Sequence, residues 1–119
     1  MIDHISLYVK DMEASKAFYK AALAPLGYTI VVEGEGYCGL SDGTVLDVWL
    51  VSKPETTSQH VGFRAKDAAQ VQAFYDAALA AGATDNGAPG PREIYGPEYY
   101  GGFITDINGH NLEAQVRKS

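Results

Sequence analysis

Residues 60–80 read HVGFRAKDAAQVQAFYDAALA, and they repeat residues 4–24, which read HISLYVKDMEASKAFYKAALA. When His60 is aligned with His4, which lies 56 residues earlier, ten of the 21 positions are identical. Two unrelated amphipathic segments do not agree so closely. A repeat of this length indicates one supersecondary unit used twice, so we predict a fold built from a pair of modules.

The second half of each module also repeats, at a longer spacing. The segment from Asp42-Gly43 to Val48 aligns with the segment from Asn108-Gly109 to Ala114, 66 residues further on. Because this spacing exceeds the first, module two should contain an insertion, and the Gly- and Pro-rich residues 87–97 are the natural place for it. The two alignments match His4 with His60 and Asp47 with Glu113, which predicts two imidazoles and two carboxylates in equivalent positions.

Local patterns give the same order of elements in both modules. In module one, alternating residues 2–9 predict a strand, Asp11 is a candidate N-cap for a helix to about Leu23, and residues 28–33, 37–41 and 44–51 predict three strands. Module two repeats the plan with a strand at 59–65 and a helix from Asp67 to about Ala81. A short strand at 83–87, a strand at about 100–106 and a last strand to about Arg117 complete it.

We therefore predict an α+β fold of two βαβββ modules related by a pseudo-twofold axis. Module one spans about 1–51, a polar linker about 52–58, and module two about 59–119, all within a single domain. The strands should form a cupped, mostly antiparallel sheet with the helices on its outer face. The opposite face is too polar for a core and predicts a lined cleft, formed by His4, Ser6, Tyr8, Asp47, Trp49, His60, Gly62, Arg64, Asn111, Glu113 and Gln115.

Composition narrows the setting and the partners. The net charge of −6 argues against nucleic acid or an anionic membrane as a partner, and leaves a small molecule as the expected ligand. Cys38 is the single cysteine, so no intrachain disulfide forms. The chain enters its first strand directly from Met1, without a secretory signal pattern, and we expect a cytoplasmic protein.

Three stretches resemble the vicinal oxygen chelate superfamily, which includes glyoxalase I, extradiol dioxygenases, fosfomycin-resistance transferases and bleomycin-resistance proteins. They are residues 3–9 (DHISLYV) with Phe18-Tyr19, residues 60–63 (HVGF), and residues 105–113 (TDINGHNLE). The segments DNGAPG at 85–90 and YYGGF at 99–103 are similar to a bacterial branch of that superfamily whose reaction is undefined. The resemblance covers essentially the whole chain.

The resemblance implies a metal site. Ligands in that superfamily come from the first and last strands of each module, which correspond here to His4, His60, Glu113 and Asp47. Lyase-type members usually carry Glu where this chain has Asp47, and the shorter side chain puts that ligand in doubt. Two histidines and one carboxylate suit Fe(II) or Mn(II), and a second carboxylate suits a redox-silent metal such as Zn or Ni.

Further residues are candidates for catalysis or substrate binding beside the metal. Glu113 can combine ligation with general-base catalysis, because a carboxylate can detach and accept a proton. Arg64 could hold an anionic end of a ligand or pair with a nearby acid, and Trp49, Tyr100 and Phe103 could supply flat walls, although core packing is the alternative for Phe103. His110, an odd number of residues from Glu113, should point to the other face of the strand, and we interpret it as a turn residue.

Two functions from different classes remain open. The first is a metal-dependent enzyme, either a glyoxalase-like lyase or isomerase or an extradiol-type dioxygenase, whose substrate chelates the metal through neighbouring oxygens. The second is a drug- or metabolite-sequestering protein of the bleomycin-resistance type, without turnover, which would retain the histidines and carboxylates as a hydrogen-bond network. The short linker permits closure of the site within one chain or exchange of modules between two, and we expect a homodimer.

Overall fold

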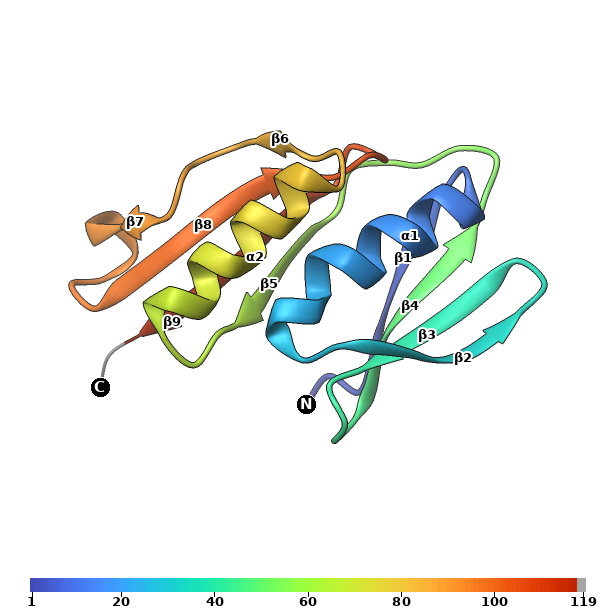
Figure 1. Ribbon diagram of the computed structural model, residues 1–119, viewed down its shortest axis with the longest axis horizontal. Helices are drawn as coiled ribbons and strands as arrows, with labels where there is room; N and C mark the ends of the chain where they lie inside the picture. Colours follow the sequence, from blue (N-terminus) through green and yellow to red (C-terminus); the bar gives the residue numbers. More distant parts are fainter. Residues whose placement is uncertain (118–119) are drawn as a thin grey trace.

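A computed structural model describes residues 1–117 of the chain, and its elements follow the predicted order in both modules (Figure 1). Module one consists of β1 (Ile5–Val9), α1 (Met12–Leu23), the short 3₁₀ helix η1 (Ala24–Leu26), β2 (Thr29–Gly34), β3 (Tyr37–Ser41) and β4 (Leu46–Ser52). Module two consists of β5 (His60–Arg64), α2 (Ala68–Ala80), β6 (Thr84–Asp85), β7 (Gly90–Pro91), η2 (Glu93–Tyr95), β8 (Tyr99–Thr105) and β9 (Asn111–Arg117). The predicted end of module two at residue 119 lies outside the described residues.

The strands form two sheets rather than the one continuous sheet that we predicted. Their orders are β1-β4-β3-β2 in module one and β5-β9-β8-β6 in module two, where β7 also pairs with β8. In the described part of the chain β1/β4 and β5/β9 are parallel, and the remaining pairs are antiparallel. Figure 1 shows the sheets side by side with α1 and α2 packed on the same face of both. The predicted α+β class, the two βαβββ modules and the placement of the helices are confirmed.

The period-two alternation of the strands decides what lies between helix and sheet. Leu7 and Val9 of β1 are fully buried, whereas His4 and Tyr8 on the opposite face are exposed. Apolar side chains of both modules form the core on the helix face, including Phe18, Tyr19, Leu23, Leu50, Phe63, Phe74, Ile104 and Leu112. The opposite faces of the two sheets are therefore free to carry polar side chains, as a site requires.

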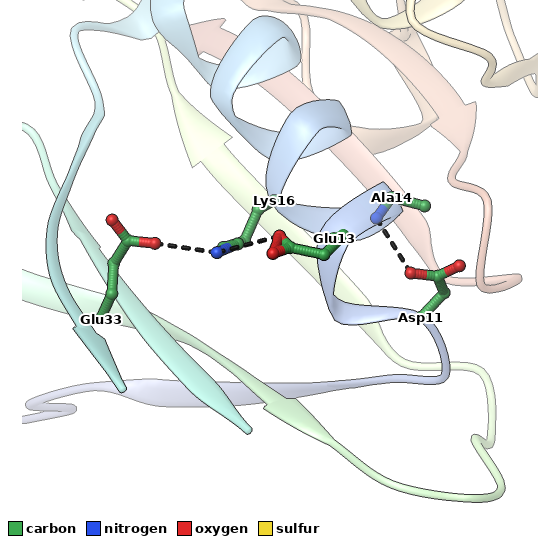
Figure 2. A network of polar contacts seen from close by, with 5 residues as sticks. All are labelled: Asp11, Glu13, Ala14, Lys16 and Glu33. Atoms are coloured by element: carbon green, nitrogen blue, oxygen red, sulfur yellow. Dashed lines mark hydrogen bonds and ion pairs between the residues drawn. The ribbon is translucent and has the colours of Figure 1, made fainter. Parts of the chain in front are cut away.

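Two sets of polar contacts fix α1 (Figure 2). The predicted cap is present, because Asp11 accepts a hydrogen bond from the Ala14 amide at 3.1 Å. Lys16 pairs with Glu33 of β2 at 2.9 Å and with Glu13 at 3.0 Å. Hydrogen bonds to Glu33 and then Glu13 raise the pKa of Lys16 above its usual range. The helix is thus tied to the outer strand of its own sheet.

His110 joins the two modules, a role that our interpretation as a turn residue missed. It is fully buried, its Nδ1 accepts the Gln59 amide hydrogen at 3.1 Å, and its Nε2 lies 2.7 Å from the Tyr8 carbonyl oxygen. Because Nδ1 accepts, the ring hydrogen sits on Nε2 and is donated to Tyr8. A second buried link runs from the Tyr19 hydroxyl of α1 to Asp106. The His110 contacts fix β1 beside the start of β5, and the Tyr19 contact ties α1 to the turn between β8 and β9.

None of the described helices is long and apolar enough to cross a membrane.

Candidate metal site

His60 and Glu113 come together on the face of module two that the helices leave open. Adjacent strands β5 and β9 place them there, since Gly62 is the register partner of Glu113 and His60 stands two residues before Gly62. His60 Nε2 lies 2.9 Å from Glu113 Oε1, with the Glu113 side chain 8% exposed and the His60 side chain 51% exposed. A buried carboxylate thus faces an imidazole that solvent and ligands can reach.

A glycine gives Glu113 its room. A Cβ atom built on Gly62 would lie 3.3 Å from Glu113 Cγ, closer than most such contacts. Any larger residue at this position would press on the carboxylate and on the His60 contact beside it. The glycine on the cleft face of this strand therefore has a local structural reason.

Tyr99 of β8 holds the other oxygen of Glu113. Its hydroxyl donates a hydrogen bond to Glu113 Oε2, and the tyrosine is 8% exposed. Burial, followed by this hydrogen bond, raises the pKa of Tyr99 to about 12. The tyrosine therefore stays a neutral donor, and Glu113 Oε1 remains directed at His60.

A cavity of about 430 Å³ opens on this pair, and we call it the glutamate cavity. Its lining consists of His60, Tyr95, Tyr99, Phe103, Asn111, Glu113 and Arg117. Tyr95 and Tyr99 meet edge to face at 5.2 Å between ring centroids. The cavity therefore joins a His–carboxylate pair to aromatic walls and a single arginine.

The corresponding half of module one is arranged differently. β1 pairs Ser6 with Trp49 of β4, and β5 pairs Gly62 with Glu113 of β9, so the residue equivalent to Glu113 is Trp49. Asp47 is instead the equivalent of Asn111. Our alignment of Asp47 with Glu113 is wrong by two residues, because it matched the turn at Asp42-Gly43 with the turn at Asn108-Gly109. The strand pairs Leu40–Val48 and Ile104–Leu112 instead align Asp42 with Asp106.

Asp47 and His4 have other local partners. The Tyr28 hydroxyl donates to both Asp47 oxygens, at 3.1 and 3.3 Å, and burial followed by Asp47 raises the pKa of Tyr28 well above its usual range. His4 Nδ1 lies 2.7 Å from Asp3 Oδ2, and the His4 side chain is 52% exposed. Neither residue is committed to a buried network, and His4 in particular is accessible.

A larger cavity of about 830 Å³ lies at the seam between the modules, and we call it the seam cavity. Residues of both modules line it, among them His4, Asp42, Asp47, His60 and Arg64. His60 is common to the two cavities. Three of the four predicted ligands thus border one cavity, although within residues 1–117 no three His, Cys, Asp or Glu side chains stand close enough together to hold a metal ion.

The structure separates the other predicted site residues. Phe103 lines the glutamate cavity, and Arg64 lines the seam cavity. Trp49 lines neither and packs beside Tyr37, with ring centroids 6.2 Å apart. Tyr100 packs against the core, because β8 turns Tyr99 and Phe103 to one face and Tyr100 to the other.

Tyr99 and Arg117 of the glutamate cavity were not among the predicted site residues, although the sequence contains the signal for both. Tyr99 is four residues before Phe103, and Arg117 is four residues after Glu113, so each shares a strand face with a residue that we did predict. Extending the alternation by two steps along each strand, from Phe103 and from Glu113, would have found them.

His60 and Glu113 fit a divalent metal as part of a ligand set. Imidazole nitrogen and carboxylate oxygen are donors that Fe, Mn, Zn and Ni accept, and here they converge within 2.9 Å. One half of a two-module fold supplies this pair, and any third protein ligand must come from elsewhere.

A two-module α+β fold with a His–carboxylate pair on parallel first and last strands defines a recognisable class. The family model described as the Glyoxalase/Bleomycin resistance protein/Dioxygenase superfamily matches residues 1–114. The chain belongs to this superfamily.

Solved structures agree over the whole chain. A glyoxalase/bleomycin resistance protein from Albidiferax ferrireducens T118 is 26% identical, with a TM-score of 0.87 over 98% of this chain and 99% of that one. A fosfomycin resistance protein from Listeria monocytogenes, solved as a mutant complexed with Mn(II) and 1S,2S-dihydroxypropylphosphonic acid, is 17% identical, with a TM-score of 0.74 over 99% and 90% of the two chains. Comparison with curated proteins gives no match. The distant likeness to the Listeria protein shows the fold alone.

Proposed function

We propose that this protein is a metal-dependent enzyme acting on a small substrate that presents neighbouring oxygens, in the manner of a glyoxalase-like lyase or isomerase or an extradiol-type dioxygenase. The observation that carries the proposal is the approach of His60 Nε2 to Glu113 Oε1 at 2.9 Å on the open face of the sheet. His60 and Glu113 would hold a divalent ion, and Mn(II) is the first to test, because a relative of the same fold binds it. Bound there, the metal would supply a Lewis acid that polarises substrate oxygens.

The chain's own residues have separate tasks in this proposal. Tyr99 keeps one Glu113 oxygen occupied, so the oxygen that faces His60 is the one that would bind the metal and, on detaching from it, accept a substrate proton. Phe103 and Tyr95 flank the space beside His60 and orient a flat substrate. Glu113 is buried, so little of its carboxylate is exposed to water.

We propose that the third ligand is His4 of a second copy, which makes the protein a homodimer. His4 is half-exposed, and within the described residues of one chain it does not join His60 and Glu113 in a three-ligand group. Both sheets have an open polar face that can meet its counterpart in another chain. Asp47 remains a candidate fourth ligand, with less reach, since its two oxygens already accept from Tyr28.

The second candidate function is a binding protein without turnover, and the seam cavity favours it. The cavity volume of about 830 Å³ is large enough for a drug-sized molecule. Its walls combine the apolar Leu26, Val48 and Phe63 with the acids Asp3, Asp42 and Asp47, which suits an apolar cation.

Metal content separates the two candidates. The test is elemental analysis of the purified protein, before and after reconstitution with Mn(II) and removal of free ion. One metal per His60–Glu113 pair supports the enzyme. A protein that retains no metal after reconstitution with Mn(II), Fe(II), Zn(II) or Ni(II) contradicts it and supports the binding protein.

A further inference from the structure

The glutamate cavity contains one Lys or Arg side chain among its lining residues, that of Arg117. Arg117 is the last described residue of β9 and lies on the same face of the strand as Asn111 and Glu113. Arg117 is thus a cation in a cavity that already contains the buried carboxylate of Glu113.

Glu113 does not neutralise Arg117. Both Glu113 oxygens are engaged, one by the Tyr99 hydroxyl and the other by His60. The four residues from Glu113 to Arg117 place their Cα atoms about 13 Å apart along an extended strand. Within residues 1–117, no ion pair forms on the Arg117 guanidinium, whose N–H groups are therefore free to bind an acceptor.

A tyrosine ring positions Arg117. The guanidinium carbon lies 5.1 Å from the centroid of the Tyr99 ring, and the hydroxyl of the same ring reaches Glu113. The Tyr99 side chain thus lies between the Arg117 guanidinium and the His60–Glu113 pair. Tyr95 packs on the edge of Tyr99, and Phe103 completes the apolar lining.

This layout selects the shape and charge of the ligand. The cavity volume of about 430 Å³ is at the small end for ligand sites. The aromatic walls favour a flat ring, the guanidinium favours a carboxylate, and His60 with Glu113 favours oxygen atoms at the far end of that ring.

We propose that Arg117 is the specificity-determining residue of the site and that the substrate is a hydroxylated aromatic carboxylate. Its carboxylate pairs with Arg117, its ring lies against Tyr99 and Phe103, and its hydroxyl oxygens reach His60 and Glu113. The inference rests on the proposed function for the oxygen end alone. The pairing of a carboxylate with Arg117 needs no metal.

The test compares two probes that differ by one carboxylate. Binding of 3,4-dihydroxybenzoate and of catechol is measured by calorimetry on the metal-free full-length protein and again after loading with Zn(II). The variants are Arg117→Gln, Arg117→Lys, and Lys20→Gln as a control, since Lys20 is an exposed cation of α1 that lines neither cavity. We expect wild type and Lys20→Gln to prefer the acid by about tenfold or more, the worth of a hydrogen bond to a charged group, and Arg117→Gln to lose that preference. Arg117→Lys should retain part of it.

Each outcome decides one claim. An unchanged preference in Arg117→Gln overturns the assignment, as does a wild-type protein that binds neither probe or binds both equally. If the acid preference depends on Arg117 while Zn(II) adds no affinity for either probe, the anion site stands and the proposed metal function fails. If Zn(II) strengthens catechol binding without any acid preference, the metal function stands and the Arg117 inference fails.

Discussion

Glu113 is the residue on which the proposed site depends, and three neighbouring residues fix the place of its carboxylate. Gly62 makes space for it, Tyr99 fixes one oxygen, and His60 faces the other. Each contact comes from a different strand, so the geometry depends on the register of β5, β8 and β9.

For single residues, the sequence predicts which side chains come together better than it predicts which other residues contact them. His60 and Glu113 were predicted together and lie together, although the ion that would join them remains a prediction. Tyr99 was passed over in favour of Tyr100, because two adjacent tyrosines look alike until the phase of β8 is known. Asp47 was matched to Glu113 because the two Gly-containing turns look alike in sequence, although they stand at different distances from the strand pairs beside them.

The Tyr99 hydroxyl should make the protein less stable at high pH than at neutral pH. Its pKa of about 12 in the folded protein exceeds the ordinary value of about 10, so the tyrosine ionises first in the unfolded chain. Its contribution to the free energy of unfolding is complete below pH 10 and is lost as the pH rises toward 12. The loss amounts to about 1 kcal/mol by pH 11. Urea unfolding of the metal-free protein at pH 8 and pH 11 measures this.

Tyr99→Phe is the matching variant, because Tyr19 and Tyr28, whose pKa values are also raised, stay in place. The variant should lose less stability than wild type between the two pH values, by the same amount of about 1 kcal/mol. Equal losses in both proteins would mean that the hydroxyl does not hold Glu113 in solution.

At the scale of elements, the repeat predicts the modules, and the register corrects it. The first strand and helix of each module are offset by 56 residues, whereas β4 and β9 are offset by 64, as Val48 and Leu112 show. The Gly- and Pro-rich segment accounts for the difference, since it forms β6 and β7 as two short strands on β8. Residues 93–95 form a 3₁₀ turn, which alternation could not foresee.

The pairing of β5 with β9 gives a prediction for Gly62. Gly62→Ala keeps a backbone that alanine tolerates, but the added methyl group presses on Glu113 Cγ at 3.3 Å. We expect the variant to fold and to bind Mn(II) about tenfold more weakly, as for the loss of a supporting contact around a metal ligand. Thermal unfolding and metal titration measure the two properties.

Ser6→Ala is the control for Gly62, because Ser6 occupies the equivalent place in β1. Its hydrogen bond to the Gln59 side chain uses the backbone carbonyl, which alanine retains. Metal affinity should therefore be unchanged. Equal weakening by both substitutions would show that the effect is general and that Gly62 has no special relation to Glu113.

At the scale of the whole molecule, the arrangement of the two modules decides where His4 lies relative to the His60–Glu113 pair. The buried His110 and Tyr19 contacts fix the two modules of one chain relative to each other, and this arrangement leaves His4 outside the His60–Glu113 pair. The repeat could not predict this arrangement, because it is equally compatible with a site closed within one chain and a site shared between two chains.

Mixing two variants that should each have lost metal binding tests the proposal that His4 comes from a second copy. His4→Ala and Glu113→Ala damage different halves, so dimers formed from the two chains contain one intact site and one doubly damaged site. After unfolding and refolding together, about a quarter of the sites should bind Mn(II) at wild-type affinity. A mixture of His60→Ala with Glu113→Ala should restore none, because both changes lie in the same half. No recovery in the first mixture would place His4 in the site of its own chain or outside it.

The most direct measurement is a calorimetric titration of Mn(II) into the wild-type protein, Glu113→Gln and Asp47→Asn. Glutamine is nearly isosteric with glutamate and keeps the fold, but it removes the anionic ligand. Glu113→Gln should weaken metal binding by about tenfold to a hundredfold or more, and Asp47→Asn should have a smaller effect, because Asp47 is held by Tyr28 outside the buried pair. Metal binding by Glu113→Gln as tight as that of wild type would contradict the assignment of the site to His60 and Glu113.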